Sequence, residues 1–286
     1  MLPWYALARL YGWSLRVLGY QGRIRGMGFL LRRVGQDHII EAEGLRIHFN
    51  HHVGGCYDAL VARKRFGESE THRFLASVLR QESVGTGVVF LDVGANIGEL
   101  SLDLARHPKV ESVIAFEPNA ECARSLAESA ALNRLEKEIT IRQVALNSSG
   151  GQVRFHIDTR SPNASHLAGA GETRIEVPAS TLDGETSSLA GEVIVKIDVE
   201  GAELEVLKGG RRLLETLRPL LIFEYNEVSR RSFSLDDIRS LLGQDYAIWR
   251  LRGDGLLDAS FGSTWNCVAA HHATVFADAC RSLEAT

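Results

Sequence analysis

The sequence predicts a doubly wound α/β domain, in which helices cover both faces of a mostly parallel sheet. From about residue 88 onward, apolar segments of strand length alternate with segments of helix length. The strand segments are nearly continuous apolar runs, which is typical of strands buried on both faces. A glycine-rich turn, GANIG at 94–98, directly follows the first of them. Ligands of such sheets bind at the carboxyl ends of the strands, so the loops there are the candidate functional segments.

The elements follow in chain order. Before the sheet, HIIEAEGLRIHF at 38–49 predicts two short strands around a Glu-Gly turn, and 69–81 predicts a helix. The core strands are expected at 88–93, 112–117, 139–144, 193–198 and 220–225. The helices are expected at 97–107, 119–133, 201–216 and 234–242.

Two further strand pairs lie outside this repeat. Residues 245–251 and 265–272 flank a turn-rich loop and predict a closing antiparallel hairpin. An insertion between the third and fourth core strands contains alternating stretches at 151–157 and 173–179, which predict a small β insertion.

Composition excludes several classes of protein. The chain has 286 residues, 45% hydrophobic and 24% charged, with a net charge of −4. A general nucleic-acid binder would show a basic footprint, so no nucleic-acid partner is expected. The cysteines lack CxxC or Cys/His ligand spacing and predict reduced thiols in a cytoplasmic protein, with no disulfide framework or zinc site. They are Cys56, Cys122, Cys267 and Cys280.

The first 35 residues form a basic and strongly apolar segment. They contain six arginines and no aspartate or glutamate, so their charge is +6, and the net charge of −4 leaves −10 for the remainder. Arg9 and Arg16 interrupt the apolar stretch 4–20, which is short of the roughly 20 apolar residues that a spanning helix needs. The stretch also lacks the small-residue cleavage site of a signal peptide.

Two interpretations of this segment stay open. Arg9 and Arg16 are seven residues apart and share a helical face, with aromatic and leucine side chains around the rest. Such a helix can lie on the inner face of a membrane and attract anionic lipid, which predicts a peripheral contact through residues 1–35. Alternatively, the helix packs on its own domain or on the second subunit of a homodimer.

The turn after the first strand predicts close approach of the main chain to a ligand. Gly94 allows a sharp turn where a Cβ would obstruct it, and Gly98 lets the following helix pack close to the strand. The pattern lacks the middle glycine of GxGxxG, which admits a pyrophosphate, and it lacks the lysine of a P-loop. Taken alone, a tight structural turn remains an alternative.

An acidic residue supports a cofactor loop. Glu117 ends the second strand in AFEPN, where a carboxylate can bind the vicinal hydroxyls of a ribose. The alternative role is an acid at a helix N-terminus, since Pro118 can open the next helix. Together the two strand ends favour an adenosine without a diphosphate. S-adenosylmethionine meets this description, and Asp92 could face the ammonium group of its amino acid tail.

The fourth strand yields a second charged signature, VKIDVEGAE at 195–203. Lys196 and Asp198 are two apart and share a face of the strand, and Glu200 follows in the loop. Buried charges are costly unless they are paired, which indicates a functional role at this strand end. The alternative is a structural ion pair of Lys196 with Asp198 or Glu224.

Taken together, FLDVGANIG, AFEPN, VALNSSGG, STLD and IVKIDVEGAELEVLKG closely resemble the FkbM family of S-adenosylmethionine-dependent methyltransferases. The resemblance runs from about residue 66 to 250, in the family's order. It implies a class I methyltransferase (Rossmann-like) fold of about seven strands with the last antiparallel. It also implies O-methylation, commonly of sugars, polyketides or other hydroxylated products. We therefore divide the chain into a basic extension, 1–65, and a methyltransferase domain, 66–286.

The resemblance also implies site residues. Those that match the family's cofactor-binding positions are Asp92, Gly94, Asn96, Gly98, Glu117 for the ribose and Ala145 near the adenine. Glu68 resembles the acid that precedes the first strand in the family, although Gly67 stands where the family usually has an aromatic residue. Asp198 lies beside the cofactor strand, so we count it with the cofactor-binding residues too.

Methyl transfer to a hydroxyl benefits from a base that accepts the proton. Asp198 is the first candidate and Glu200 the second, while Lys196 could orient Asp198 or stabilise the developing alkoxide. Glu224 ends the next strand, where it could bind acceptor hydroxyls. His166, in the insertion, is a rival base. Asp198, Glu200 and Glu224 could also supply oxygen ligands to a divalent metal, but no spacing requires one and none is predicted.

Two other classes of function are weaker alternatives. An NAD-dependent oxidoreductase is disfavoured by the missing middle glycine. A non-catalytic binding module is disfavoured because a scaffold does not need acidic and glycine residues at several strand ends.

Overall fold

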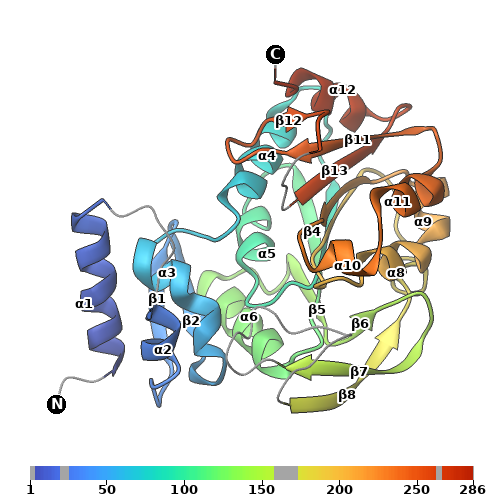
Figure 1. The fold of residues 1–286 in the computed structure, drawn as a ribbon. Helices are drawn as coiled ribbons and strands as arrows, with labels where there is room; N and C mark the ends of the chain where they lie inside the picture. Colours follow the sequence, from blue (N-terminus) through green and yellow to red (C-terminus); the bar gives the residue numbers. More distant parts are fainter. Residues whose placement is uncertain (1–3, 20–25, 158–172, 262–265, 286) are drawn as a thin grey trace.

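The computed structural model describes residues 4–19, 26–157, 173–261 and 266–285. At its centre is an eight-stranded sheet in the order β12-β11-β13-β10-β9-β3-β4-β5 (Figure 1). The strands are β3 (Val88–Val93), β4 (Val110–Phe116), β5 (Ile139–Arg142), β9 (Val193–Ile197), β10 (Leu220–Glu224), β11 (Tyr246–Leu251), β12 (Leu257–Asp258) and β13 (Asn266–His271). The run from β5 to β10 is parallel, and β13 is antiparallel to both β10 and β11. The predicted α/β fold with a closing antiparallel pair is therefore confirmed.

Side-chain alternation along the central strands divides the core into two halves. On β3, Val88 and Phe90 face one half, whereas Val89, Leu91 and Val93 face the other. The first half is covered by α4 (Ser69–Arg80), α5 (Glu99–Leu104), α6 (Ala120–Asn133) and α12 (Val275–Ser282). The second half is covered by α8 (Glu203–Lys208), α9 (Arg211–Thr216) and α11 (Leu235–Leu242). All six β3 residues are buried, as their continuous apolar run predicts.

One predicted helix is wrong in detail. The segment 201–216 is not a single helix but the two helices α8 and α9, which are separated by Gly209 and Gly210. Glycine gains more backbone freedom than other residues when it leaves a helix, so a Gly-Gly pair favours a break. Other boundaries differ by a few residues, as at α5, because helix ends are set by tertiary contacts as well as by local sequence.

The insertion forms a separate three-stranded sheet, as expected from its alternating pattern. It contains β6 (Ala145–Leu146), β7 (Gly151–Ile157) and β8 (Thr173–Ser180), with β7 and β8 antiparallel. Two short helices, α7 (Leu182–Glu185) and α10 (Ser229–Ser232), complete the domain.

The N-terminal extension packs against the main domain (Figure 1). It consists of α1 (Trp4–Val17), α2 (Met27–Leu31), the hairpin β1 (His38–Ala42) and β2 (Leu45–Phe49), the 3₁₀ helix η1 (His51–Tyr57) and α3 (Asp58–Arg63). The backbone N–H groups of Arg46 and His48 donate to Asn133 Oδ1 at 3.0 Å and to Ser129 Oγ at 2.9 Å, which attaches the hairpin to α6. The boundary at residue 65 stays a prediction.

Helix α1 lies against α3 of its own chain. Arg16 donates to the carbonyl oxygens of Val61 at 3.1 Å and Ala62 at 2.6 Å, so it stabilises the C-terminal turn of α3. Leu10 and Trp13 remain more than half exposed. No described helix is long and apolar enough to cross a membrane.

Candidate active site

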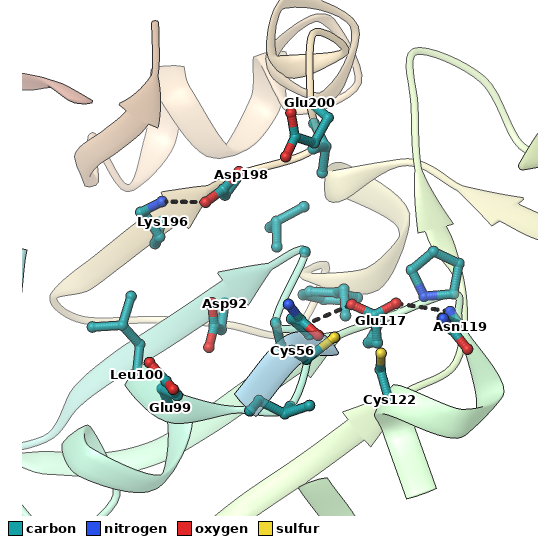
Figure 2. Close-up of a pocket in the computed structure, with 18 of the residues that line it drawn as sticks. Cys56, Asp92, Glu99, Leu100, Glu117, Asn119, Cys122, Lys196, Asp198 and Glu200 are labelled. Atoms are coloured by element: carbon teal, nitrogen blue, oxygen red, sulfur yellow. Dashed lines mark hydrogen bonds and ion pairs between the residues drawn. The ribbon is translucent and has the colours of Figure 1, made fainter. Parts of the chain in front are cut away.

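A cavity of about 310 Å³ opens at the carboxyl ends of β3, β4, β9 and β10 (Figure 2). The predicted residues that line it are Glu68, Asp92, Gly94, Asn96, Glu117, Ala145, Lys196, Asp198, Glu200 and Glu224. Gly98 does not line the cavity. His166, the rival base, lies outside the described residues. The structure thus brings one loop from each strand end to the same site, as parallel topology requires.

The two glycines of the loop after β3 each avoid a different steric clash. Gly94 has φ of 83°, and a Cβ there would lie 1.9 Å from the carbonyl oxygen of Asp198. Any other residue would therefore push apart the loops that follow β3 and β9. At Gly98, a Cβ would lie 2.1 Å from Leu126 Cδ1, so this glycine allows α5 to approach α6. The sequence pattern therefore reflects close packing around the cavity.

Glu117 joins the glycine loop to the end of β4. Asn96 N donates to its Oε2 at 2.7 Å, and Asn119 N donates to its Oε1 at 2.8 Å (Figure 2). Asn119 is the N-cap of α6, so Glu117 also supports a helix start, the alternative role considered above. Burial raises the pKa of Glu117 to about 7 in spite of these two bonds. Each oxygen keeps a second lone pair that can accept a further hydrogen bond.

Asp92 lies in the floor of the cavity. The hydroxyl of Ser101 donates to its Oδ2 at 2.5 Å, and burial raises its pKa to about 6. In the register of β3 and β9, Asp92 stands opposite Lys196.

Lys196 is a buried cation held by two acids. Its Nζ lies 3.1 Å from Asp198 Oδ2 and 3.2 Å from Glu68 Oε2. Burial would lower the pKa of Lys196, but the negative charges of Asp198 and Glu68 outweigh burial and raise it. The lysine therefore stays protonated and can orient a carboxylate or stabilise negative charge. The sequence predicts Asp198 or Glu224 as the partner of Lys196. The structure confirms Asp198 and adds Glu68 as the second partner, in place of Glu224.

Glu68 reaches the cavity from the loop before α4. Asn266 Nδ2, on β13, donates to its Oε2 at 3.0 Å. Burial would raise the pKa of Glu68, but the Lys196 ammonium and these hydrogen bonds lower it to about 2. Glu68 is therefore ionised, and its carboxylate interacts with the Lys196 ammonium and with the Asn266 amide on β13.

Three carboxylates gather at the ends of β9 and β10. Burial raises the pKa of Asp198, although the Lys196 ammonium opposes the shift. Burial, followed by the charge of Asp198, raises the pKa of Glu200 to about 8. Burial and the charges of Asp198 and Glu200 raise the pKa of Glu224 to about 10. The ends of these two adjacent strands therefore bring three acidic side chains with raised pKa values into one place.

Glu203 shapes the loop that carries Glu200. One of its oxygens accepts hydrogen bonds from Val199 N and Gly201 N, both at 3.1 Å. Glu200 adopts φ of 54°, a left-handed conformation that is uncommon for residues with a Cβ. The last glutamate of VKIDVEGAE is thus a positioning residue, and sequence reasoning assigned it no role. Its place at the start of a helix directly after the loop was the available signal.

Glu99 is a second lining residue that the sequence interpretation missed. Its Oε2 accepts a hydrogen bond from Gly67 N at 2.6 Å, and burial raises its pKa to about 7. It directly follows DVGANIG, so adjacency to the glycine loop was the only local signal. Cys56 and Cys122 also line the cavity, although they had been interpreted only as reduced thiols.

Comparisons with known proteins agree with this geometry. A family model described as the methyltransferase FkbM domain matches residues 92–250. The chain is 29% identical over 160 residues to the hexuronic acid methyltransferase AglP of Haloferax volcanii, which covers 54% of this chain and 62% of AglP. It is 29% identical over 152 residues to the methyltransferase sdnD of Sordaria araneosa, covering 42% of this chain and 59% of that protein. The chain thus matches about three fifths of the length of these relatives.

Solved structures of other methyltransferases align with this chain at low identity. A methyltransferase FkbM from Methylobacillus flagellatus KT aligns with a TM-score of 0.46 and 18% identity, over 91% of this chain and 66% of that one. TYW2 of M. jannaschii, solved in complex with AdoMet, aligns with a TM-score of 0.40 and 14% identity, over 82% and 84% of the two chains. Because the family model covers more than half of the sequence, and the sheet has the class I methyltransferase arrangement, this chain belongs to the FkbM methyltransferase family.

Proposed function

We propose that this protein transfers a methyl group from S-adenosylmethionine to a hydroxyl group of a sugar or another hydroxylated metabolite. The observation that carries the proposal is the layout of one cavity. A glycine loop and Glu117 lie at one part of it, and Lys196 with a group of carboxylates lies at the ends of β9 and β10. A cofactor subsite and an acceptor subsite therefore share one space.

The chemistry of the lining fits the cofactor. Its charged residues are mostly carboxylates, with Lys196 as the lysine among them. Such a lining favours a cationic ligand, and S-adenosylmethionine carries a sulfonium and an ammonium group. Glu117 would accept bonds from the ribose hydroxyls, Asp92 would face the ammonium group, and Ala145 would lie near the adenine. The close backbone approach that Gly94 permits would bring main-chain atoms to the ligand.

When bound, S-adenosylmethionine supplies a methyl group activated by its sulfonium. The protein then has to align the acceptor oxygen with that methyl group and exclude water. Asp198 would accept the hydroxyl proton as the oxygen–carbon bond forms, with Glu200 as the second choice. A raised pKa makes either carboxylate a stronger base. Lys196 would hold Asp198 in place and stabilise the developing negative charge on oxygen.

The sugar acceptor is supported by one relative, AglP, whose name describes it as a hexuronic acid methyltransferase. The test is release of S-adenosylhomocysteine by the purified protein with hexuronic acids, neutral sugars and non-sugar polyols, combined with mass spectrometry of the product. A mass gain of one CH₂ on a hydroxyl is expected. Binding of NAD with no binding of S-adenosylhomocysteine would instead support the oxidoreductase alternative.

We also propose that the N-terminal extension contacts an anionic membrane surface. Leu10, Trp13 and Val17 are each more than half exposed and, with spacings of three and four residues, lie on one side of α1. The charge of +6 on residues 1–35 complements anionic lipid. The Arg33 guanidinium lies over the exposed Phe29 ring at 3.6 Å, which places basic and aromatic groups together. We further propose that the enzyme is cytoplasmic and binds peripherally at the inner face of the membrane.

A further inference from the structure

The ends of β9 and β10 hold a compact group of carboxylates. Asp198 directly follows β9, Glu200 lies two residues later, and Glu224 is the last residue of β10. One carboxylate oxygen from each of the three lies within 4.8 Å of the others. The strands are adjacent and parallel, so their ends bring these residues together from separate parts of the sequence. Figure 2 shows Glu200 next to Asp198, with Lys196 on the other side of Asp198.

Glu224 provides an observation that is independent of this clustering. It is only 8% exposed, and its buried Oε2 accepts no hydrogen bond from any described residue. A buried carboxylate oxygen without a partner is rare in folded proteins, because it has given up water without replacing it. The ammonium of Lys196 cannot fill the role, since it lies against Asp198 and Glu68. The group therefore contains a buried carboxylate oxygen that accepts no hydrogen bond from any described residue.

We propose that Asp198, Glu200 and Glu224 bind a divalent cation of the hard, oxygen-preferring kind. Carboxylates without nitrogen or sulfur ligands favour Mg²⁺, Mn²⁺ or Ca²⁺ over Zn²⁺ and Cu²⁺. Oxygens bound to Ca²⁺ can be up to about 5 Å apart, whereas oxygens bound to Mg²⁺ can be up to about 4.2 Å apart. All three oxygens lie within 4.8 Å of one another, a limit that admits either size of cation.

The cation would define how the acceptor binds, and this part of the inference rests on the proposed methyl transfer. Three protein ligands leave coordination positions open for water or for hydroxyl oxygens of the acceptor. A hydroxyl bound to a divalent cation has a lowered pKa, so its proton leaves more readily, to water or to a carboxylate oxygen not bound to the cation. The cation would thereby favour acceptors with two neighbouring oxygens, such as a vicinal diol or a hexuronic acid.

The direct experiment is a titration of the metal-free full-length protein with Mn²⁺, followed by electron paramagnetic resonance, without cofactor or acceptor. We expect one Mn²⁺ site and binding at least tenfold weaker in Glu224→Gln and in Glu200→Gln. Glu200 is partly exposed, so Glu200→Gln should remain folded even if Glu224→Gln does not. Circular dichroism checks the fold of both variants. Glu205→Gln is the matched control, because Glu205 is an exposed acid on α8 that pairs with Lys208. No bound Mn²⁺ in the wild type, or equal binding in all four proteins, would overturn the cation site.

A second measurement separates this inference from the proposed function. Calorimetry with S-adenosylhomocysteine, in the presence of EDTA, reports the cofactor subsite alone. Cofactor binding together with full turnover in EDTA would refute a role of the cation in binding the acceptor while leaving the methyltransferase proposal intact. One Mn²⁺ bound at the carboxylates without any cofactor binding would support the cation site and refute the proposed function.

Discussion

Lys196 and Glu68 are 128 residues apart in the chain, yet their side chains form an ion pair of 3.2 Å in the wall of the cavity. Asn266, on β13, donates to the same carboxylate. The contact therefore joins the loop before α4, the central strand β9 and the closing strand β13. It keeps the lysine charged beside Asp198, which is the arrangement that the proposed mechanism needs.

The first prediction concerns this ion pair. Glu68→Gln leaves Lys196 with one acid instead of two, so we expect a loss of about 1–2 kcal/mol in the free energy of unfolding, less than for a fully buried pair. We also expect turnover to fall, because Asp198 loses part of its positioning. Urea denaturation and steady-state kinetics measure the two effects. Glu82→Gln, at an exposed residue beyond α4, is the control and should change neither.

The second prediction tests the base. In Asp198→Asn the side chain keeps its size but can no longer accept the proton, so turnover should fall by about 10²–10⁴-fold. The affinity for S-adenosylhomocysteine, measured by calorimetry, should fall far less than turnover, because Asp198 lies beside the cofactor strand and other residues also bind the cofactor. Full turnover with unchanged cofactor affinity would show that Asp198 is not the base and would direct attention to Glu200.

The third prediction tests the ribose contact. Glu117→Ala removes a carboxylate that also holds Asn96 N and Asn119 N, so we expect cofactor binding to be lost in calorimetry. Glu111→Ala changes an exposed acid on the same strand, β4, and should bind normally. Normal affinity in Glu117→Ala would exclude the assigned role, whereas a folded variant with no binding would support it.

The fourth prediction concerns pH. The pKa values of Glu117 and Glu99 are raised to about 7 and that of Asp92 to about 6, all chiefly by burial. An acid with a raised pKa holds its proton longer in the folded than in the unfolded protein, so the free energy of unfolding of the cofactor-free protein should fall as pH rises from about 4.5 to about 7. Glu99→Gln should make this fall shallower in urea denaturation at a series of pH values.

Binding of the positively charged cofactor should lower these raised pKa values. A positively charged cofactor favours the ionised carboxylates, so its binding near pH 7 should release protons. Calorimetry in buffers of different ionisation enthalpy measures the number released. Proton uptake on binding, or no proton change between pH 6 and 8, would contradict a cationic ligand in this cavity.

The fifth prediction concerns the membrane. Full-length protein should float with anionic liposomes and less with neutral ones, and the double variant Leu10→Ser/Trp13→Ser should lose this binding. Val228→Ser changes an exposed apolar residue far along the chain and serves as the control. If the wild type stays unbound to anionic liposomes, the contact through residues 1–35 is wrong.

Much of the fold could be predicted because its signals are local. The continuous apolar runs identify β3, β4, β5, β9 and β10, because strands buried on both faces typically have this pattern, and the predicted bounds of β3 agree with the structure to the residue. The break at Gly209–Gly210 was missed because the apolar periodicity continues across it. The site residues at strand ends could be grouped in advance, because parallel topology places all carboxyl ends on one edge.

The sequence by itself determined the α/β class, the glycine turn and the acids at the strand ends, because each depends on residues close together in the chain. Only the tertiary structure decided that Glu68 pairs with Lys196, that Arg16 stabilises the end of α3, and that Glu224 joins Asp198 and Glu200. Those contacts depend on which strands become neighbours and on how loops of different length return to the sheet. Local sequence patterns do not encode these contacts, because the contacts form only when the whole core packs.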